Sequence, residues 1–292
     1  MQRPTTLDVV ARIPRVLAIA GSDSGAGAGI QADLKAFAAC GVHGMTAITA
    51  ITAQNTVGVS AVHPIPPDVI IAQVSAVATD IGVDAVKIGM LGDRRTIEAV
   101  ARALAELPDA TPVVLDPVMV AESGAQLLDP SARATLIELL VPRATVVTPN
   151  LPEARSLVDS TAQLDTADLA RALHALGPRA VVVTGGHREE ATDVFFDGER
   201  LVELPGERHP DGATHGSGCT HSSVLAARLA HGDDPLEAAR AARQLASEAV
   251  AHGLREIGAG AGPVDILGIA SKAAETGAAT TSGHPATGNV LT

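Results

Sequence analysis

The segment TPVVLDPV, residues 111–118, is an apolar run followed by an aspartate and a proline. Runs of the same kind occur elsewhere in the chain: RVLAIAG at 15–21, DAVKIGM at 84–90, ATVVTPN at 144–150 and RAVVVTGG at 179–186. They are apolar almost throughout instead of alternating, which is typical of strands in a sheet that is covered on both faces. Each run ends near Gly, Pro or Asn, where the strand is predicted to turn out of the sheet.

Longer Ala-rich amphipathic segments separate these runs and predict helices. They lie at 30–41, 66–80, 94–107, 131–140, 150–158, 165–176, 218–231 and 235–253, with a further strand at 44–55. Strands that alternate with helices predict an α/β fold with a central, mostly parallel sheet and right-handed crossovers. Two short runs around Asp197 and Gly198 predict a hairpin at the sheet edge.

Length and composition set the domain organisation. We expect a single domain over residues 15–267, because α/β folds of this size often form one core. Residues 1–14 are then an N-terminal extension. Residues 268–292, which are small, polar and aperiodic, are expected to be a disordered tail.

The formal net charge of -12 and an aromatic content of 1% argue against a nucleic-acid-binding protein. No apolar run approaches the roughly 20 residues of a membrane helix, so no membrane association is expected. The N-terminal residues lack the features of a signal peptide, and Cys40 and Cys219 do not form a disulfide framework. The sequence therefore predicts a cytoplasmic protein.

In an open parallel sheet, ligands bind beyond the carboxyl ends of the strands. The first strand is followed there by GSDSGAGAGIQAD, residues 21–33, whose glycines are spaced G-x-G-x-G and not as in a dinucleotide fingerprint. Two interpretations stay open: a tight packing turn, or a loop that lets backbone approach a small ligand, with Asp33 one helical turn further on.

Carboxylates follow two other strands. Asp116 ends one strand, and Asn150 and Glu153 lie at the next strand–helix junction. Such a pair suits a hydrated Mg²⁺, which takes few protein ligands. The alternative is a helix cap, with Asn150 as N-cap and Glu153 as its capping-box partner, and the two roles are compatible.

The segment HGSGCT, residues 215–220, places glycines just before a predicted helix, so that backbone amides converge on an anion site. The same helix terminus is expected to lower the pKa of Cys219. Cys219 is then a nucleophile, a proton acceptor or a small buried side chain, and the residues alone do not choose. A zinc site with His209, His215 and His221 lacks a second cysteine at a suitable spacing.

Seven segments together resemble the bacterial hydroxymethylpyrimidine/phosphomethylpyrimidine kinases of thiamin biosynthesis. In order they are AGSDSGAGAGIQADLKAF, TAQNTVGV, KIGMLGD, LDPVM, TPNLPEA, TGGH and THGSGCT, and the resemblance runs from about residue 15 to about 266. It implies a ribokinase-like three-layer sandwich and two successive ATP-dependent phosphorylations, first of 4-amino-5-hydroxymethyl-2-methylpyrimidine and then of its monophosphate. It also implies a homodimer.

The resemblance assigns roles to residues of this chain. It implies a pyrimidine pocket made by Gly21, Ala28, Asp33, Gln54, Met90 and Val118. Asp116 and Glu153 would hold Mg²⁺, and Asn150, Thr184 and Gly186 would bind the nucleotide. Cys219 would accept the proton of the substrate hydroxyl, while the amides of Gly216, Ser217 and Gly218 stabilise the charge of the transferred phosphoryl group.

Three residues depart from the family pattern: Ala26 replaces a glycine, Thr184 a common lysine and His221 an apolar residue. Alternative functions are a pyridoxal or pyridoxine kinase of the same fold and a non-catalytic small-molecule sensor. A cysteine hydrolase, which would need neither ATP nor Mg²⁺, is a further alternative.

Overall fold

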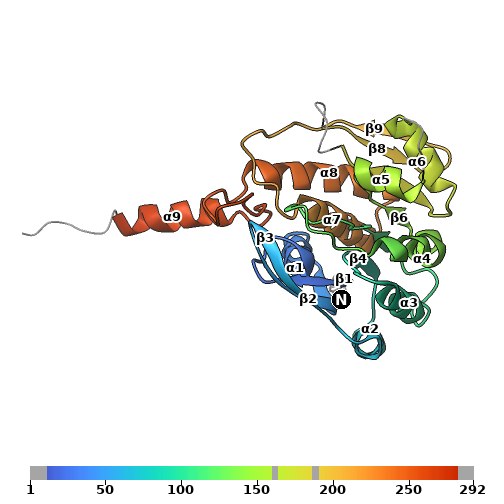
Figure 1. Ribbon diagram of the computed structural model, residues 1–292. Coiled ribbons are helices and arrows are strands. Elements are labelled where there is room, and N and C mark those ends of the chain that lie inside the picture. Colours follow the sequence, from blue (N-terminus) through green and yellow to red (C-terminus); the bar gives the residue numbers. More distant parts are fainter. Residues whose placement is uncertain (1–11, 160–163, 186–190, 282–292) are drawn as a thin grey trace, which may run out of the picture.

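The computed structural model describes residues 12–159, 164–185 and 191–281, and within them the chain forms one nine-stranded sheet (Figure 1). The strand order is β3-β2-β1-β4-β5-β6-β7-β8-β9. The parallel strands are β1 (Arg15–Asp23), β2 (His43–Asn55), β4 (Ala85–Ile88), β5 (Val113–Leu115), β6 (Val146–Val147) and β7 (Ala180–Val183). The predicted central, mostly parallel sheet is confirmed.

Both edges of the sheet are antiparallel. Strands β8 (Asp193–Phe196) and β9 (Leu201–Leu204) form the predicted hairpin, and β8 also pairs with β7. At the other edge β3 (Gly58–Pro64) folds back on β2 and was not predicted from the sequence. Most of its residues are exposed, so its sequence lacks the apolar run that marks the inner strands.

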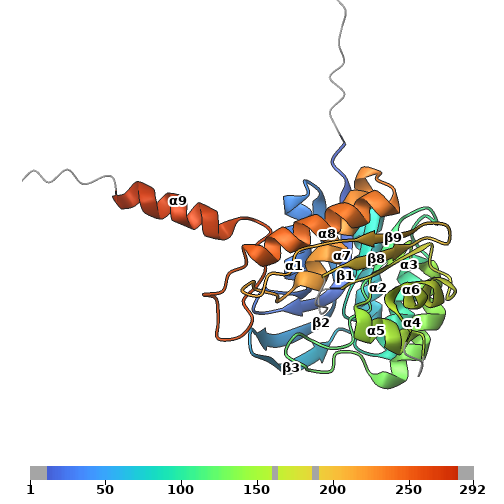
Figure 2. The same ribbon diagram turned by 90° about the horizontal axis from the view of Figure 1, so that it is seen from above.

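Helices cover the two faces of the sheet and give three layers (Figures 1 and 2). One face carries α2 (Pro67–Asp80), α3 (Arg94–Leu104), α4 (Arg133–Leu139), α5 (Leu151–Leu157) and α6 (Thr166–His174). The other carries α1 (Gly29–Ala39), α7 (Ser217–His231) and α8 (Pro235–Ala251). Strand β1 shows why its sequence is apolar throughout: Leu17 and Ile19 pack into the first core, and Val16 and Ala18 into the second.

The expectation of a disordered tail from residue 268 is wrong for its first part. Residues Ile269–Thr281 form helix α9, which projects away from the body of the molecule (Figures 1 and 2). The carboxylate of Asp265 accepts hydrogen bonds from the amides of Ile269 and Ala270 at 2.8 and 2.9 Å, and alanine has the highest helix propensity. A start cap and an Ala-rich segment are therefore sufficient to form a helix without an apolar face.

Candidate active site

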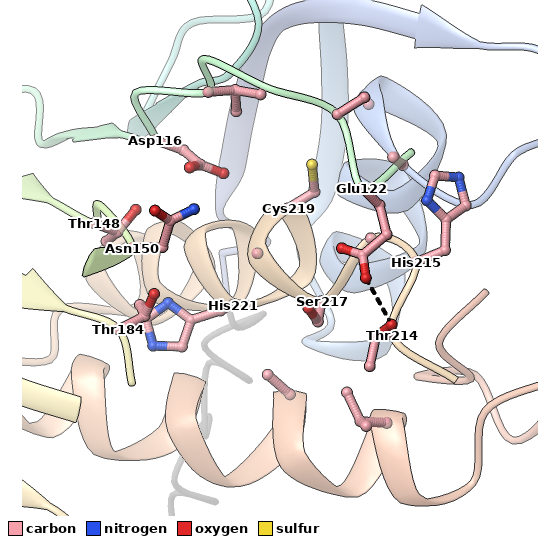
Figure 3. A pocket seen from close by; sticks show the side chains of 18 of the residues that line it. Asp116, Glu122, Thr148, Asn150, Thr184, Thr214, His215, Ser217, Cys219 and His221 are labelled. Carbon is pink, nitrogen blue, oxygen red and sulfur yellow. Dashed lines mark hydrogen bonds between the residues drawn. The ribbon is translucent and has the colours of Figure 1, made fainter. Parts of the chain in front are cut away.

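A pocket of about 490 Å³ lies beyond the carboxyl ends of the parallel strands, between the sheet and the first turn of α7 (Figure 3). This is the edge at which the sequence placed the ligand. The predicted site residues that line it are Gly21, Ala28, Gln54, Met90, Asp116, Val118, Asn150, Glu153, Thr184, Gly216, Ser217, Gly218 and Cys219. Gly186 lies outside the described residues.

The first turn of α7 forms one end of the pocket. Gly216 has a φ of 86°, and a Cβ there would lie 1.8 Å from the carbonyl oxygen of Gly27, so only glycine fits. The first bond within the helix runs from the Thr220 amide to the Gly216 carbonyl, which leaves the amides of Gly218 and Cys219 without partners inside the helix. Such amides bind anions.

The prediction that the Ser217 amide binds phosphate is wrong for this arrangement of the turn. It donates to the carbonyl of Thr214 at 3.0 Å, because the turn closes on itself before the helix begins. The predicted set of phosphate-binding amides therefore loses Ser217 in this arrangement, although its side chain lines the pocket.

The prediction that the helix terminus lowers the pKa of Cys219 is wrong. Burial raises the pKa of the thiol to about 12, and the nearby carboxylates of Asp33 and Asp116 add to the increase. Lys87 and the backbone amide of Gly29 act in the opposite direction but do not compensate. Desolvation of a thiolate exceeds the helix-terminus field here, so the thiol of the ligand-free protein is neutral at pH 7.

Asp33 also requires a correction, because it does not line the pocket. Its side chain is fully buried below the pocket floor, where it accepts hydrogen bonds from Lys87 Nζ at 2.8 Å and Ser223 Oγ at 2.7 Å. Helix α1 starts at Gly29, and one turn of rotation directs Asp33 toward β4 and α7 instead of toward the ligand space. The predicted hydrogen bond from Asp33 to a pyrimidine is therefore not available.

Of the ion pair Asp33–Lys87, it is Lys87 and not the predicted Asp33 that lines the pocket. Burial by itself would lower its pKa, but Asp33, Cys219 and Asp116 raise it above the ordinary value. The sequence contained a signal for it: Lys87 is the single charged residue inside the apolar run AVKIGM. A buried cation at a strand end is a candidate anion-binding group.

The two predicted carboxylates lie together. Glu153 Oε2 accepts from the Asn150 amide at 2.9 Å, and Asn150 Oδ1 accepts from the Glu153 amide at 2.9 Å, which confirms the capping box. Burial raises the pKa of Glu153 to about 8, with Asp116 contributing, and burial also raises the pKa of Asp116, which accepts from Ser222 Oγ at 2.9 Å.

The chemistry of this donor set decides which metal ion it can hold. The described residues contain no group of three or more His, Cys, Asp or Glu that could hold a metal ion. Two buried carboxylates with raised pKa values do fit a cation that keeps several waters and takes few protein ligands. The pair is therefore suited to Mg²⁺ and not to a fully protein-coordinated metal.

A buried His–Asp pair that the sequence did not predict holds the glycine-rich loop. Asp23 accepts from His215 Nε2 at 3.0 Å and from the amides of Gly25, Gly27 and Ala28 at 2.8–3.0 Å. Although burial opposes it, these hydrogen bonds lower the pKa of Asp23. The pair thus joins the loop before α1 to the turn before α7 and fixes both walls of the pocket.

The loop after β5 crosses the mouth of the pocket. Its Glu122 accepts a hydrogen bond from Thr214 Oγ1 at 2.9 Å (Figure 3). At the floor, a Cβ on Gly21 would lie 2.4 Å from Met90 Cε, so the glycine lets this methionine approach the strand. Met90, Gln54 and Val118 then form an apolar end with one amide, suited to a small ring.

The family model described as phosphomethylpyrimidine kinase matches residues 23–265. This chain belongs to that family. The curated hydroxymethylpyrimidine/phosphomethylpyrimidine kinase of Rhizobium meliloti is 51% identical over 254 residues, which cover 85% of this chain and 95% of the relative. That of Bacillus subtilis is 45% identical and covers 87% and 94%.

Solved structures give the same result for the fold. The phosphomethylpyrimidine kinase of Clostridium difficile has a TM-score of 0.72 at 39% identity, and covers 82% of this chain and 100% of its own. The pyridoxal kinase of Bacillus subtilis in complex with ADP has a TM-score of 0.78 at 40% identity, covering 87% and 97%. The fold is therefore the ribokinase-like sandwich that the sequence resemblance implied.

A second wall of the pocket carries charged and polar side chains that the sequence did not assign to the site. It contains Asp193, His221 and Arg243. Asp193 was missed because β8 is antiparallel, so that its first residue and not its last lies at the ligand edge, next to the end of β7. From the sequence, His221 is a departure from the family pattern and a weak zinc-ligand candidate, and Arg243 lies in the middle of an Ala-rich helix.

Proposed function

We propose that this chain transfers a phosphoryl group from ATP to the hydroxymethyl oxygen of 4-amino-5-hydroxymethyl-2-methylpyrimidine and then phosphorylates the monophosphate to the diphosphate. One observation carries the proposal: the amides of Gly218 and Cys219, which have no partner inside the helix, line the same pocket as a buried carboxylate pair, in a chain that belongs to the family. This arrangement provides an anion site and a cation site on either side of a transferring phosphoryl group.

The pocket residues divide the work. The amides of Gly218 and Cys219, together with Lys87, stabilise the charge on the phosphoryl oxygens. Asp116 and Glu153 would hold Mg²⁺, which would supply charge neutralisation of the nucleotide phosphates. The substrate oxygen forms a bond to phosphorus, the bond from phosphorus to the ADP oxygen breaks, and the hydroxyl proton goes to Cys219 Sγ.

Proton transfer to Cys219 requires the thiolate. Because burial keeps the thiol neutral in the ligand-free protein, the thiol must lose its proton before the transfer, and Lys87 is the cation that favours this loss. The rate should therefore rise with pH through the alkaline range, because the active form is the deprotonated one.

The test is ADP release with three substrates: the hydroxymethylpyrimidine, its monophosphate and pyridoxal. We expect turnover of both pyrimidines and a much lower kcat/KM for pyridoxal. Cys219→Ala should lower kcat by about a hundredfold or more with little change in pyrimidine KM, while the matched Cys40→Ala should leave both unchanged. No turnover of either pyrimidine would refute the proposal, and preferred turnover of pyridoxal would reassign the chain to the second activity found among its structural neighbours.

The homodimer and the cytoplasmic location stay predictions. Within the described residues, no helix combines the length and the apolar character needed to cross a bilayer.

A further inference from the structure

One wall of the pocket is formed by Thr148, Asp193, His221 and Arg243, and it holds several buried polar atoms without a hydrogen-bond partner among the described residues. Among the described residues, hydrogen bonds are lacking at Thr148 Oγ1, Asp193 Oδ2, both ring nitrogens of His221 and Arg243 Nε. Thr148, Asp193 and His221 are only 4%, 1% and 5% exposed, and all four residues line the pocket. Native proteins leave few buried polar atoms unpaired, so a concentration of them along one wall indicates a polar ligand.

His221 is the central member of this wall. It lies three residues after Gly218 on α7, and therefore on the same side of the helix as the free amides. Figure 3 shows its ring among the labelled side chains that line the pocket, together with those of Thr184, Asn150 and Thr148. Its charge also lowers the pKa of Asp116, although burial outweighs this effect, so the ring lies within electrostatic range of the carboxylate pair.

The carboxylate of Asp193 lies next to the imidazole ring of His221. Asp193 Oδ1 accepts from the Gly185 amide at 2.8 Å, which fixes the carboxylate, and its Oδ2 lies 3.5 Å from His221 Nε2. Arg243 Nε lies 3.9 Å from the same oxygen. One carboxylate oxygen thus faces both an imidazole and a guanidinium nitrogen, and neither distance is short enough for a hydrogen bond.

We propose that His221 is a nucleotide-binding residue that donates a hydrogen bond to a phosphate oxygen of bound ATP, with Asp193 as its positioning residue. The inference rests on the proposed ATP-dependent function. In this arrangement Nε2 of the ring faces Asp193 Oδ2, and the other ring nitrogen is directed to the phosphate oxygen. The phosphate chain would then run from the amides of Gly218 and Cys219 along the α7 face to Thr184.

A core histidine is the competing explanation, and the contacts argue against it. Leaving both nitrogens of a buried imidazole unpaired costs stability without return, whereas a ligand oxygen would satisfy at least one of them. Buried histidines with a purely structural role normally hydrogen-bond to protein groups, as His215 does with Asp23 at 3.0 Å.

The experiment is isothermal titration of ADP and of adenosine into wild-type protein and His221→Leu, with magnesium present throughout. We expect the ADP dissociation constant to rise about tenfold or more and the adenosine constant to change less than twofold. His221→Gln, which keeps an N–H donor, should recover part of the loss. His231→Leu, at the exposed end of the same helix, is the matched control and should bind both ligands as wild type does.

Asp193→Asn keeps the shape of the side chain and an oxygen for the Gly185 amide, so it tests the proposal even if His221→Leu does not fold. It should also weaken ADP more than adenosine. Unchanged ADP affinity in these variants, or an equal loss for ADP and adenosine, would overturn the proposal. Because the readout is binding, a wild-type protein that binds ADP but phosphorylates no pyrimidine would refute the proposed function and leave this inference standing.

Discussion

Lys87→Met should destabilise the protein strongly, because it removes the cation of a fully buried pair. Both side chains are 0% exposed, and Lys87 Nζ lies 2.8 Å from Asp33 Oδ1. Methionine fills a similar volume, but Asp33 would keep only the hydrogen bond from Ser223, and its Oδ2 already has no partner among the described residues. Removing one member of such a pair costs about 3–5 kcal/mol.

The cost can be expressed as a melting temperature. With an unfolding entropy of about 2.1 cal/mol/K per residue, a chain of this length loses about 5–8 °C for that free energy. The double variant Lys87→Met/Asp33→Leu should recover most of the loss, since a buried ion pair is often replaceable by apolar side chains at little cost.

Thermal unfolding followed by far-UV circular dichroism is the suitable assay, because the chain contains no Trp and no Tyr for fluorescence. A fall of less than about 2 °C in the single variant, or a double variant as unstable as the single one, would refute the reasoning. The first result would mean that solvent reaches the pair, and the second that the residues do not interact energetically.

Three further predictions concern the pocket. Burial raises the pKa of Glu153 to about 8, above its ordinary 4.5, so its contribution to stability is fully present below about pH 4.5 and is lost as pH rises to about 8. Glu153→Gln, which preserves the capping box, should therefore flatten the fall in melting temperature between about pH 5 and 8, and an unchanged slope would contradict this. Because its pKa is about 12, Cys219 of the ligand-free protein should react with iodoacetamide at pH 8 about a thousandfold more slowly than a free thiol, as measured by mass spectrometry. A rate near that of a free thiol would contradict the raised pKa. Thr214→Val removes the hydrogen bond to exposed Glu122 and should change stability by less than about 1 kcal/mol while raising the KM of the substrates severalfold; equal KM values would show that this contact does not hold the loop over the pocket.

Much of the fold follows from local patterns. The apolar runs predicted the parallel strands because a strand covered on both faces has little room for polar side chains. The edge strand β3 was not predicted from the sequence, because an exposed edge strand needs no apolar run. Helix α9 was not predicted either, because a start cap and alanines form a helix without a periodic apolar face. The position of the pocket followed from the rule that ligands bind beyond the carboxyl ends of parallel strands.

The sequence alone therefore predicts the α/β class, the edge of the sheet at which ligands bind, the capping box of Asn150 and Glu153 and, through the resemblance, the family. The tertiary structure decided the rest, because it depends on which side chains are desolvated together. In the folded chain Lys87 lines the pocket and Asp33 does not. The pKa of the Cys219 thiol is raised there, whereas the helix terminus alone predicted a lowered one. It also placed His221 against Asp193. Burial and pairing arise between residues far apart in the chain, and no local pattern contains them.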